Sequence, residues 1–285
     1  MKALVLGAGG MLGRAVVGEG RRAGHEIAGL ARAELDVTDT HSVARAVAAA
    51  EPDLVVNCAA FTDVDGAEAE VEAALRVNRD GAAAVAAAAE RVGAAIVYPS
   101  TDYVFDGRKR EPYVESDDPA PLSSYGRSKL AGERATAEAN PRHFVVRTSW
   151  LFGVGGRNFV DTMLGLAAQG RSVRVIDDQV GSPTFCGHLA AGLLRLAGEG
   201  GYGVHHATAD GACSWFELAG HVFAAAGLEC DLSPCSTAEM PRPATRPAYS
   251  VLRSERADGI RLPHWRDGVT AYLAEREPAV GGTRR

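Results

Sequence analysis

The segment SSYGRSKLAGER, residues 123–134, places a tyrosine and a lysine four positions apart, at Tyr125 and Lys129. The pattern predicts a helix, on which residues four apart share one face. Lysine is scarce in this chain, since it occurs only at positions 2, 109 and 129. A free phenol has a pKa of about 10, and a neighbouring ammonium favours the phenolate and lowers that pKa. We therefore expect a tyrosine that exchanges a proton with a carbonyl oxygen as hydride is transferred, the alternative being an ordinary amphipathic helix face.

A hydroxyl residue, Thr101, ends a predicted strand in YPSTDYVFDG, residues 98–107. A hydroxyl at this position would hydrogen-bond the same carbonyl oxygen and hold it in line. Thr101, Tyr125 and Lys129 are therefore the predicted catalytic group.

Three glycines, Gly7, Gly10 and Gly13, lie between the first apolar run and the first helical pattern in VLGAGGMLGRA. At a strand-to-helix turn such glycines make the turn tight, let the backbone approach a pyrophosphate and let the helix pack closely on the sheet. The helix N-terminus then presents unpaired N–H groups to the phosphates. The spacing predicts a dinucleotide site that includes Met11 and Leu12, with a simple tight turn as the alternative.

The end of the second predicted strand carries an arginine, Arg32, where a site that prefers NAD often has a carboxylate. Arginine suits a 2′-phosphate, so NADPH is favoured over NADH, unless Arg32 is a solvated loop residue. Asp36 is placed either near the adenine, with Val37 beside it, or as a helix cap. Ala59 and Ala60 end the fourth predicted strand, where small side chains allow a cofactor to approach or simply allow close packing.

Short apolar runs alternate with helical patterns along the first two thirds of the chain. We expect strands at 2–8, 25–31, 34–39, 53–60, 94–101, 143–151, 171–178 and 202–208, and helices at 13–24, 39–51, 67–92 (interrupted near Asn78 and Gly81), 125–139, 158–170 and 181–197. Such an alternation of uniformly apolar strands with helices predicts an α/β fold, a doubly wound parallel sheet (Rossmann) with a smaller mixed α/β substrate lobe. The predicted dinucleotide-binding domain comprises 1–152 and 183–208, the substrate lobe 153–182 and 209–276, and 277–285 a disordered tail.

The composition restricts the classes of partner. The chain has 285 residues, 46% of them hydrophobic, and a net charge of −6, which gives no basic surface for nucleic acid or an acidic membrane. No apolar run reaches the roughly 20 residues that span a bilayer, and the N-terminus lacks a signal-peptide pattern, so we expect a cytoplasmic protein. The five scattered cysteines and eight histidines form no metal-ligand spacing, so no metal site is predicted.

Taken together, these motifs resemble the extended short-chain dehydrogenase/reductases. STDYVFDG, PLSSYGRSKLAGE, VVRTSWLFG, DDQVGSPT and RPAYSVL resemble, in order, the dTDP-4-dehydrorhamnose reductase branch, over about residues 1–275. The resemblance implies reduction of the 4-keto group of a nucleotide-activated 6-deoxysugar with NADPH or NADH. It makes Tyr125 the proton donor, Lys129 the ligand of the nicotinamide ribose, and Thr101 the residue that orients the keto oxygen.

The resemblance also implies contacts to the nucleotide-diphosphate sugar. Thr62, Asp102, Tyr103 and Trp150 would lie beside the sugar, and Asn158 and Arg246 would meet the diphosphate. Trp150 as a core residue and Arg246 as an ordinary surface arginine remain alternatives. Some members bind a metal through glutamates at a dimer interface, but Arg14 occupies the corresponding stretch here. We therefore carry no metal over, and a homodimer remains open.

Two other functions compete with the reductase. An epimerase or dehydratase of the same superfamily keeps its NAD tightly bound, but a dehydratase would have an Asp-Glu pair after the threonine, where this chain has Asp102-Tyr103. A non-catalytic regulatory subunit is the third reading. The complete set of Thr101, Tyr125 and Lys129 argues against it. The sequence leaves open which sugar is reduced and the stereochemistry at C4.

Overall fold

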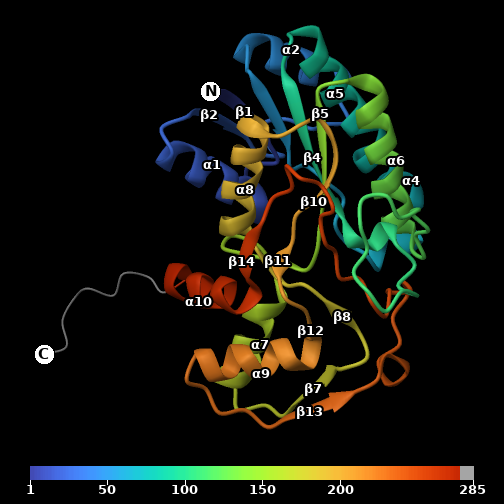
Figure 1. Ribbon diagram of the computed structural model, residues 1–285, viewed down its shortest axis with the longest axis vertical. Coiled ribbons are helices and arrows are strands. Elements are labelled where there is room, and N and C mark those ends of the chain that lie inside the picture. Colours follow the sequence, from blue (N-terminus) through green and yellow to red (C-terminus); the bar gives the residue numbers. More distant parts are fainter. Residues whose placement is uncertain (277–285) are drawn as a thin grey trace, which may run out of the picture.

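The computed structural model describes residues 1–276 and contains a parallel sheet with helices on both faces (Figure 1). Six strands lie in the order β10-β5-β4-β3-β1-β2, all parallel. They are β1 (Lys2–Leu6), β2 (Glu26–Leu30), β3 (Leu54–Asn57), β4 (Ala95–Thr101), β5 (His143–Thr148) and β10 (Gly203–His206). The predicted doubly wound α/β fold is confirmed. Because β2 and β3 flank β1 on opposite sides, the connections reverse direction at β1, and ligands of such sheets bind beside that point.

Alternate residues of each central strand face different helices. On β1, Ala3 and Val5 pack in a core with α1 (Met11–Arg22) and α8 (Cys186–Glu199), whereas Leu4 and Leu6 pack with α2 (Thr40–Ala50) and α5 (Ala82–Arg91). The second layer also holds α6 (Ser124–Ala139), which packs against α5. This alternation explains why the strands read as continuous apolar runs, since both faces of the sheet are buried.

The strand predicted at 34–39 is wrong. Residues 32–38 form turns instead, in which the backbone N–H groups of Glu34 and Leu35 both donate to the carbonyl of Ala31. Asp36 then accepts from both the N–H and the hydroxyl of Thr38, at 2.9 and 2.8 Å. These local bonds replace the ladder that a strand would need. Asp39, as expected of a residue at the helix start, caps α2 by accepting from the N–H groups of His41 and Ser42.

The predicted break in the helix after β3 is confirmed. The segment contains α3 (Gly66–Ala69), α4 (Val71–Leu75) and a π-helical turn, η1 (Arg76–Gly81), before α5. Within η1 the buried Asn78 side chain bonds both backbone groups of Phe61 and the hydroxyl of Ser128 on α6. The π turn therefore aims one amide at the loop after β3, which borders the site described below.

The second lobe has its own core below the sheet in Figure 1. Its helices are α7 (Phe159–Ala168), α9 (Trp215–Ala225) and α10 (Trp265–Arg276). The chain also contains two short helical turns, η2 (Asp102–Val104) and η3 (Thr237–Glu239). Its short strand pairs are β7–β13, β8–β12, β6–β9 and β11–β14, formed by β6 (Leu151–Phe152), β7 (Val173–Ile176), β8 (Val180–Gly181), β9 (Thr184–Phe185), β11 (Ala209–Asp210), β12 (Cys213–Ser214), β13 (Leu232–Cys235) and β14 (Leu262–His264).

The chain crosses between the lobes more often than the predicted boundaries allow. Leu252 packs with Phe105 and Tyr113, and Ile260 and Leu262 belong to the same core as β1 and α8. Part of the segment 209–276 therefore lies against the larger lobe. The exact domain boundaries stay a prediction, and the predicted tail, 277–285, lies outside the described residues.

Candidate active site

The carboxyl end of β4 contacts one face of α6 at three consecutive residues. The Thr101 hydroxyl lies close enough to the Tyr125 phenol to lower its pKa, and the Lys129 ammonium donates to the Pro99 carbonyl at 2.8 Å. Between them, the Ser100 hydroxyl donates to the Glu133 carboxylate at 2.5 Å. The structure therefore brings together the three residues predicted to be catalytic.

The Tyr125 phenol is strongly desolvated. Burial raises its pKa to about 12, against the opposing effect of the Thr101 hydroxyl, and the Asp102 carboxylate nearby raises it further. The net shift of the Tyr125 pKa is therefore upward, and the expected lowering by Lys129 does not outweigh burial. The physical reason is that burial disfavours both charged forms, so the lysine is affected as well.

Lys129 is almost fully buried, with 3% of its surface exposed. Burial lowers its pKa to about 7, while the Glu133 carboxylate and Cys58 raise it. Its ammonium also lies 4.0 Å from the centre of the Tyr98 ring, which is a favourable cation–π contact. The Lys129 side chain is thus packed against β4, and its ionisation depends on the groups around it.

The glycine turn after β1 is enforced by close backbone contacts. Gly7 has a φ of +72°, and a Cβ there would lie 2.6 Å from the backbone nitrogen of Ala59. A Cβ on Gly13 would lie 2.3 Å from the Gly7 carbonyl oxygen, so α1 can approach the turn only without one. A Cβ on Gly10 meets nothing closer than 3.5 Å, which leaves the entrance to α1 open.

A cleft of about 480 Å³ opens beside this turn, at the point where the strand order reverses. Its lining contains seven of the predicted cofactor residues: Gly7, Gly10, Arg32, Asp36, Val37, Ala59 and Ala60. Gly13 and Leu12 lie behind it in α1, Leu12 being buried in the core, and Met11 lines a neighbouring cavity. The shape and lining fit a dinucleotide, since glycine and alanine keep the walls free of bulky side chains.

The positive charge at the far end of the cleft comes from two arginines. Arg32 follows β2 and Arg76 begins η1, and both act on the Asp36 carboxylate, whose pKa is lowered mainly by its bonds to Thr38. Arg76 was not predicted as a cofactor residue. It lies more than 40 positions from Arg32, and only the fold brings the two together.

The acidic residue after Thr101 is buried. Asp102 exposes 2% of its surface, and burial raises its pKa to about 7 against the opposing effects of Ser250 and of Thr101, whose hydroxyl donates to the carboxylate at 3.1 Å. Tyr103, next in the chain, packs edge-on against Tyr125 with ring centres 6.0 Å apart. Both predicted sugar contacts therefore border the catalytic group.

The other predicted substrate contacts differ in their exposure and in the residues that they contact. Thr62 is exposed in the loop after β3. The Trp150 ring stacks on Trp215 of α9 at a 3.5 Å centroid distance, and Trp150 has a left-handed φ of 48°. Asn158 is buried as the cap of α7, where its side chain accepts from the Asp161 N–H and donates to the Tyr272 hydroxyl. This structural task occupies the amide, so its contact with a diphosphate stays a prediction.

Arg246 is tied to the larger lobe. Its guanidinium makes two hydrogen bonds with the Asp65 carboxylate, at 3.0 and 2.9 Å, and lies near Tyr103, which raises its pKa. Only 14% of its side chain is exposed, which excludes the alternative of an ordinary surface arginine. Arg246 therefore spans from the second lobe to the residues around Tyr125.

Comparison with known proteins decides the family. Residues 1–277 match the family described as the RmlD substrate binding domain. The chain belongs to this family. Among relatives, it is 43% identical to a dTDP-4-dehydrorhamnose reductase of Streptomyces griseus, over 98% of this chain and 94% of that protein. It is 42% identical to a probable dTDP-4,6-dihydroxy-2-methyloxan-3-one 4-ketoreductase of Streptomyces antibioticus, over 98% and 96% of the two chains.

A solved structure of the same kind has a closely similar fold. The dTDP-4-dehydrorhamnose reductase of Bacillus anthracis, in complex with NADP, superposes with a TM-score of 0.93 at 38% identity, covering 96% of this chain and 100% of that one. The predicted family is thereby confirmed.

Three residues of this RmlD-family chain were missed by the sequence analysis although they border the site: Arg76, Glu133 and Ser250. Glu133 does carry a signal in the sequence, because it follows Lys129 by four positions and so continues the face of Tyr125 and Lys129. Arg76 and Ser250 carry none, since each depends on a contact between distant segments.

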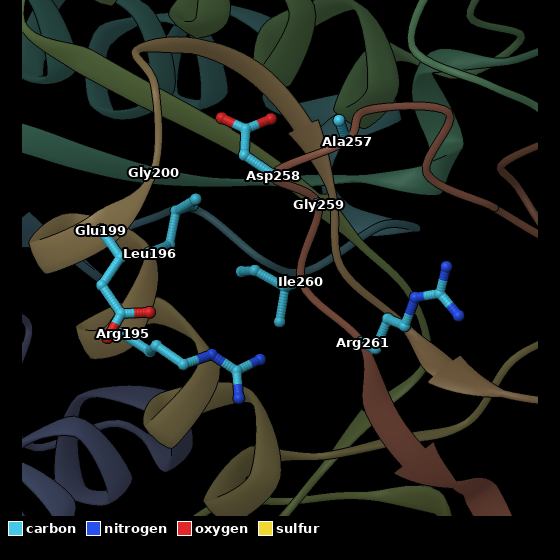
Figure 2. Close-up of a pocket in the computed structure, with 9 residues that line it drawn as sticks. All are labelled: Arg195, Leu196, Glu199, Gly200, Ala257, Asp258, Gly259, Ile260 and Arg261. Carbon is cyan, nitrogen blue, oxygen red and sulfur yellow. The ribbon is translucent and has the colours of Figure 1, made fainter.

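Another cavity, of about 320 Å³, lies between the end of α8 and residues 257–261 (Figure 2). Its lining includes Arg195 and Glu199 of α8 and Asp258 and Arg261 of the facing segment, and no predicted site residue lines it. Within residues 1–276 no group of three or more histidine, cysteine or acidic side chains is arranged to hold a metal ion. No helix in that range has the length and apolar character needed to span a bilayer.

Proposed function

We propose that this protein uses NADPH to reduce the 4-keto group of a dTDP-activated 4-keto-6-deoxysugar. The observation that carries the proposal is the contact of β4 with α6, where Thr101 and Pro99 of the strand meet Tyr125 and Lys129 of the helix, with Cys58 of the glycine-lined cleft acting on Lys129. The relatives with named activities are reductases of such sugars, and one structural neighbour holds NADP.

The cleft residues would hold the cofactor. Gly7 and Gly10 leave room for the pyrophosphate at the start of α1, Ala59 and Ala60 border the path toward Lys129, and Arg32 lies where a 2′-phosphate would be. Bound NADPH would supply the hydride that reduces the carbonyl carbon. We propose that Lys129 binds the nicotinamide ribose, which keeps the reacting ring next to Tyr125.

Tyr125 would supply the proton. A phenol with a pKa of about 12 is fully protonated at neutral pH, so it is in the form that an acid needs. As the carbonyl is reduced, the C=O π bond becomes a C–H bond and an O–H bond, and the hydroxyl proton comes from Tyr125. Thr101 donates a hydrogen bond to the same oxygen and orients it, and the Lys129 ammonium stabilises the phenolate that remains.

The sugar nucleotide would bind between the two lobes. Asp102, Tyr103, Trp150 and Thr62 would border the sugar, with Asn158 and Arg246 toward the diphosphate, where a guanidinium suits phosphate oxygens. Asp102-Tyr103 lacks the second carboxylate that elimination would require, which disfavours a dehydratase. The five cysteines are free thiols, which fits a proposed cytoplasmic location.

The proposal is tested with purified protein, a panel of dTDP-4-keto-6-deoxysugars and each cofactor, with products identified by NMR. We expect NADPH oxidation coupled to one product with a C4 hydroxyl. Release of a hydride-neutral epimer or elimination product without net cofactor oxidation would instead assign an epimerase or dehydratase. No turnover of any member of the panel would refute the reductase.

A further inference from the structure

The face of α6 that carries Tyr125 and Lys129 continues to a third polar residue. Glu133 follows Lys129 by one helical turn, and its side chain is 5% exposed. Its carboxylate accepts the Ser100 hydroxyl at 2.5 Å, so it binds the residue directly before Thr101. The two strand residues that flank Ser100 bind the two catalytic side chains of the same helix. Three successive residues of the strand therefore each meet one side chain of the helix. Thr101 meets Tyr125, Ser100 meets Glu133, and Pro99 meets Lys129.

A second side chain holds this carboxylate in place from the neighbouring strand. Arg147 on β5 lies beside Ser100 in the sheet register, and its Nε and Nη2 donate to Glu133 at 3.0 and 2.8 Å. The arginine is also 5% exposed and lies over the Phe105 ring at 5.2 Å. Two forked hydrogen bonds between fully desolvated groups fix the orientation of the carboxylate as well as its charge.

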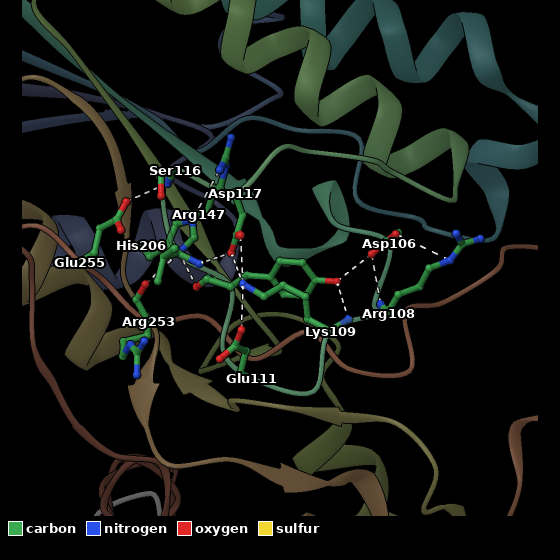
Figure 3. A network of polar contacts seen from close by, with 12 residues as sticks. Asp106, Arg108, Lys109, Glu111, Ser116, Asp117, Arg147, His206, Arg253 and Glu255 are labelled. Carbon is green, nitrogen blue, oxygen red and sulfur yellow. Dashed lines mark hydrogen bonds and ion pairs between the residues drawn. The ribbon is translucent and has the colours of Figure 1, made fainter.

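The arginine of this ion pair also contacts a histidine, His206 (Figure 3). His206 on β10 has its Nδ1 within 3.1 and 3.2 Å of the carbonyls of Tyr113 and Arg253, so Nδ1 carries the proton. Its Nε2, 3.5 Å from Arg147 Nη1, then acts as the acceptor. Burial lowers the pKa of His206 to about 4, so it adds no charge at neutral pH.

We propose that Glu133 is a positioning residue for the active site, which holds β4 in register with α6 and keeps the Lys129 ammonium charged. This inference rests on the proposed function for its catalytic meaning. The groups that act on or contact Lys129 are Glu133 from its own helix, Tyr98 and the Pro99 carbonyl from β4, and Cys58 after β3. Of these, Glu133 carries the carboxylate that opposes the effect of burial on the lysine.

Because the chain has few lysines, the ionisation of Lys129 can be measured directly by NMR, without an activity assay. Protein labelled with ¹³C at the lysine ε-carbon has three side-chain resonances, from Lys2, Lys109 and Lys129. The Lys129 resonance, assigned with Lys129→Met, is expected to titrate at a pH of about 7. In Glu133→Gln, whose amide can still accept the Ser100 hydroxyl, we expect that midpoint to fall by about 1 pH unit or more.

Two further variants separate this role from a purely structural one. Glu133→Gln leaves the Arg147 charge buried and unpaired, so Glu133→Gln/Arg147→Met is made as a second variant that removes both charges and restores folding. The lysine midpoint should stay low in it, because Lys129 still lacks its carboxylate. Glu138→Gln, an exposed glutamate on the same helix, is the matched control and should leave the midpoint unchanged.

The outcomes discriminate clearly. A Lys129 midpoint equal to that of the natural protein in both folded Glu133 variants would overturn the inference, even if their melting temperatures fall. Where the natural protein reduces the keto sugar, the basic limb of its kcat–pH profile should shift down with the lysine midpoint. A shifted lysine in a protein that turns over no sugar would instead refute the proposed function and leave the effect of Glu133 on Lys129 standing.

Discussion

Burial sets the protonation of the ionisable groups around Thr101. Burial raises the pKa of Tyr125 to about 12 and that of Asp102 to about 7, and it lowers the pKa of Lys129 to about 7. Each shift favours the neutral form. The site therefore holds a protonated phenol at neutral pH, and the charge on the lysine depends on nearby carboxylates. A protonated phenol is the form that a general acid needs. A charged lysine would stabilise the phenolate that remains after the proton is donated.

The raised pKa of Asp102 predicts a pH-dependent loss of stability. An unfolded carboxyl ionises near pH 4, whereas folded Asp102 stays protonated up to a pH of about 7. The folded state therefore binds more protons in this window, and stability falls as pH rises from about 4 to 7, by an amount on the order of 4 kcal/mol. Asp102→Asn removes this loss, so its unfolding free energy relative to the natural protein should rise from pH 4 to pH 8.

Denaturant titrations at several pH values measure this difference. Asp118→Asn, at an exposed aspartate, is the control and should show no trend with pH. A difference for Asp102→Asn that is the same at pH 4 and pH 8 would show that the folded carboxyl titrates normally.

The two arginines of the cleft make a prediction about cofactor preference. Arg32 and Arg76 flank Asp36 at the far end of the cleft, where a 2′-phosphate would meet both. Replacing either arginine with alanine should weaken the binding of NADPH by about 10-fold, as expected for the loss of a charged hydrogen bond. The affinity for NADH should stay nearly unchanged. Binding of 2′,5′-ADP and of 5′-AMP, followed by calorimetry, measures this without catalysis. Arg79→Ala, at a neighbouring arginine paired with Asp80, is the control; equal losses for both nucleotides would contradict the assignment.

At the scale of elements, α6 packs closely against its neighbours at a glycine, Gly132. A Cβ on Gly132 would lie 2.0 Å from the Asn78 carbonyl oxygen and 2.2 Å from the Tyr98 hydroxyl. Tyr98 itself donates to the same carbonyl, at 3.0 Å. The π turn η1, β4 and α6 therefore meet at one point, one helical turn from Lys129. The precision of the catalytic group depends on this packing.

Gly132→Ala should therefore destabilise the fold and disturb the site. The added methyl group has no room, and such overpacking costs about 3 kcal/mol. Gly165→Ala is the matched variant in α7, where a Cβ meets nothing within 4 Å, and it should be neutral or stabilise by up to about 1 kcal/mol. Urea unfolding followed by circular dichroism compares the two. Equal stabilities would mean that α6 can move away from η1 at little cost.

On the scale of the whole molecule, the lobes are joined by specific contacts at the mouth of the site. Arg246 binds Asp65, which directly precedes α3 in the larger lobe, and Trp150 stacks on Trp215 of α9. A sugar nucleotide between the lobes would meet both. The second lobe would therefore select the substrate, while the sheet carries the cofactor and the proton donor.

This division predicts a selective effect of Arg246. Arg246→Gln should raise KM for the sugar nucleotide by about 10-fold or more, because a charged hydrogen bond to phosphate is lost. The Kd for NADPH should not change. Arg242→Gln is the control, since Arg242 is 54% exposed and its nearest approach to Asp65 is 3.7 Å. A KM for Arg246→Gln equal to that of the natural protein would remove Arg246 from the substrate site.

The sequence was sufficient for features that depend on local spacing. The glycine turn, the α/β alternation and the shared face of Tyr125 and Lys129 are each set by residues a few positions apart, and the structure contains all three. It was insufficient where distant segments decide the outcome. The proximity of Arg76 to Arg32 and the effect of Ser250 on the Asp102 carboxyl arise only from the fold. The sign of the Tyr125 pKa shift also depends on burial, and spacing alone does not report burial.

The central claim is that Tyr125 donates the proton in reduction of a dTDP-4-keto-6-deoxysugar. The most direct measurement compares the natural protein with Tyr125→Phe at saturating NADPH and sugar, with cofactor affinity determined separately. The account predicts that kcat falls by about 10²- to 10⁴-fold, as for loss of a general acid, while the Kd for NADPH stays within about two-fold. Turnover by Tyr125→Phe at the rate of the natural protein would contradict it.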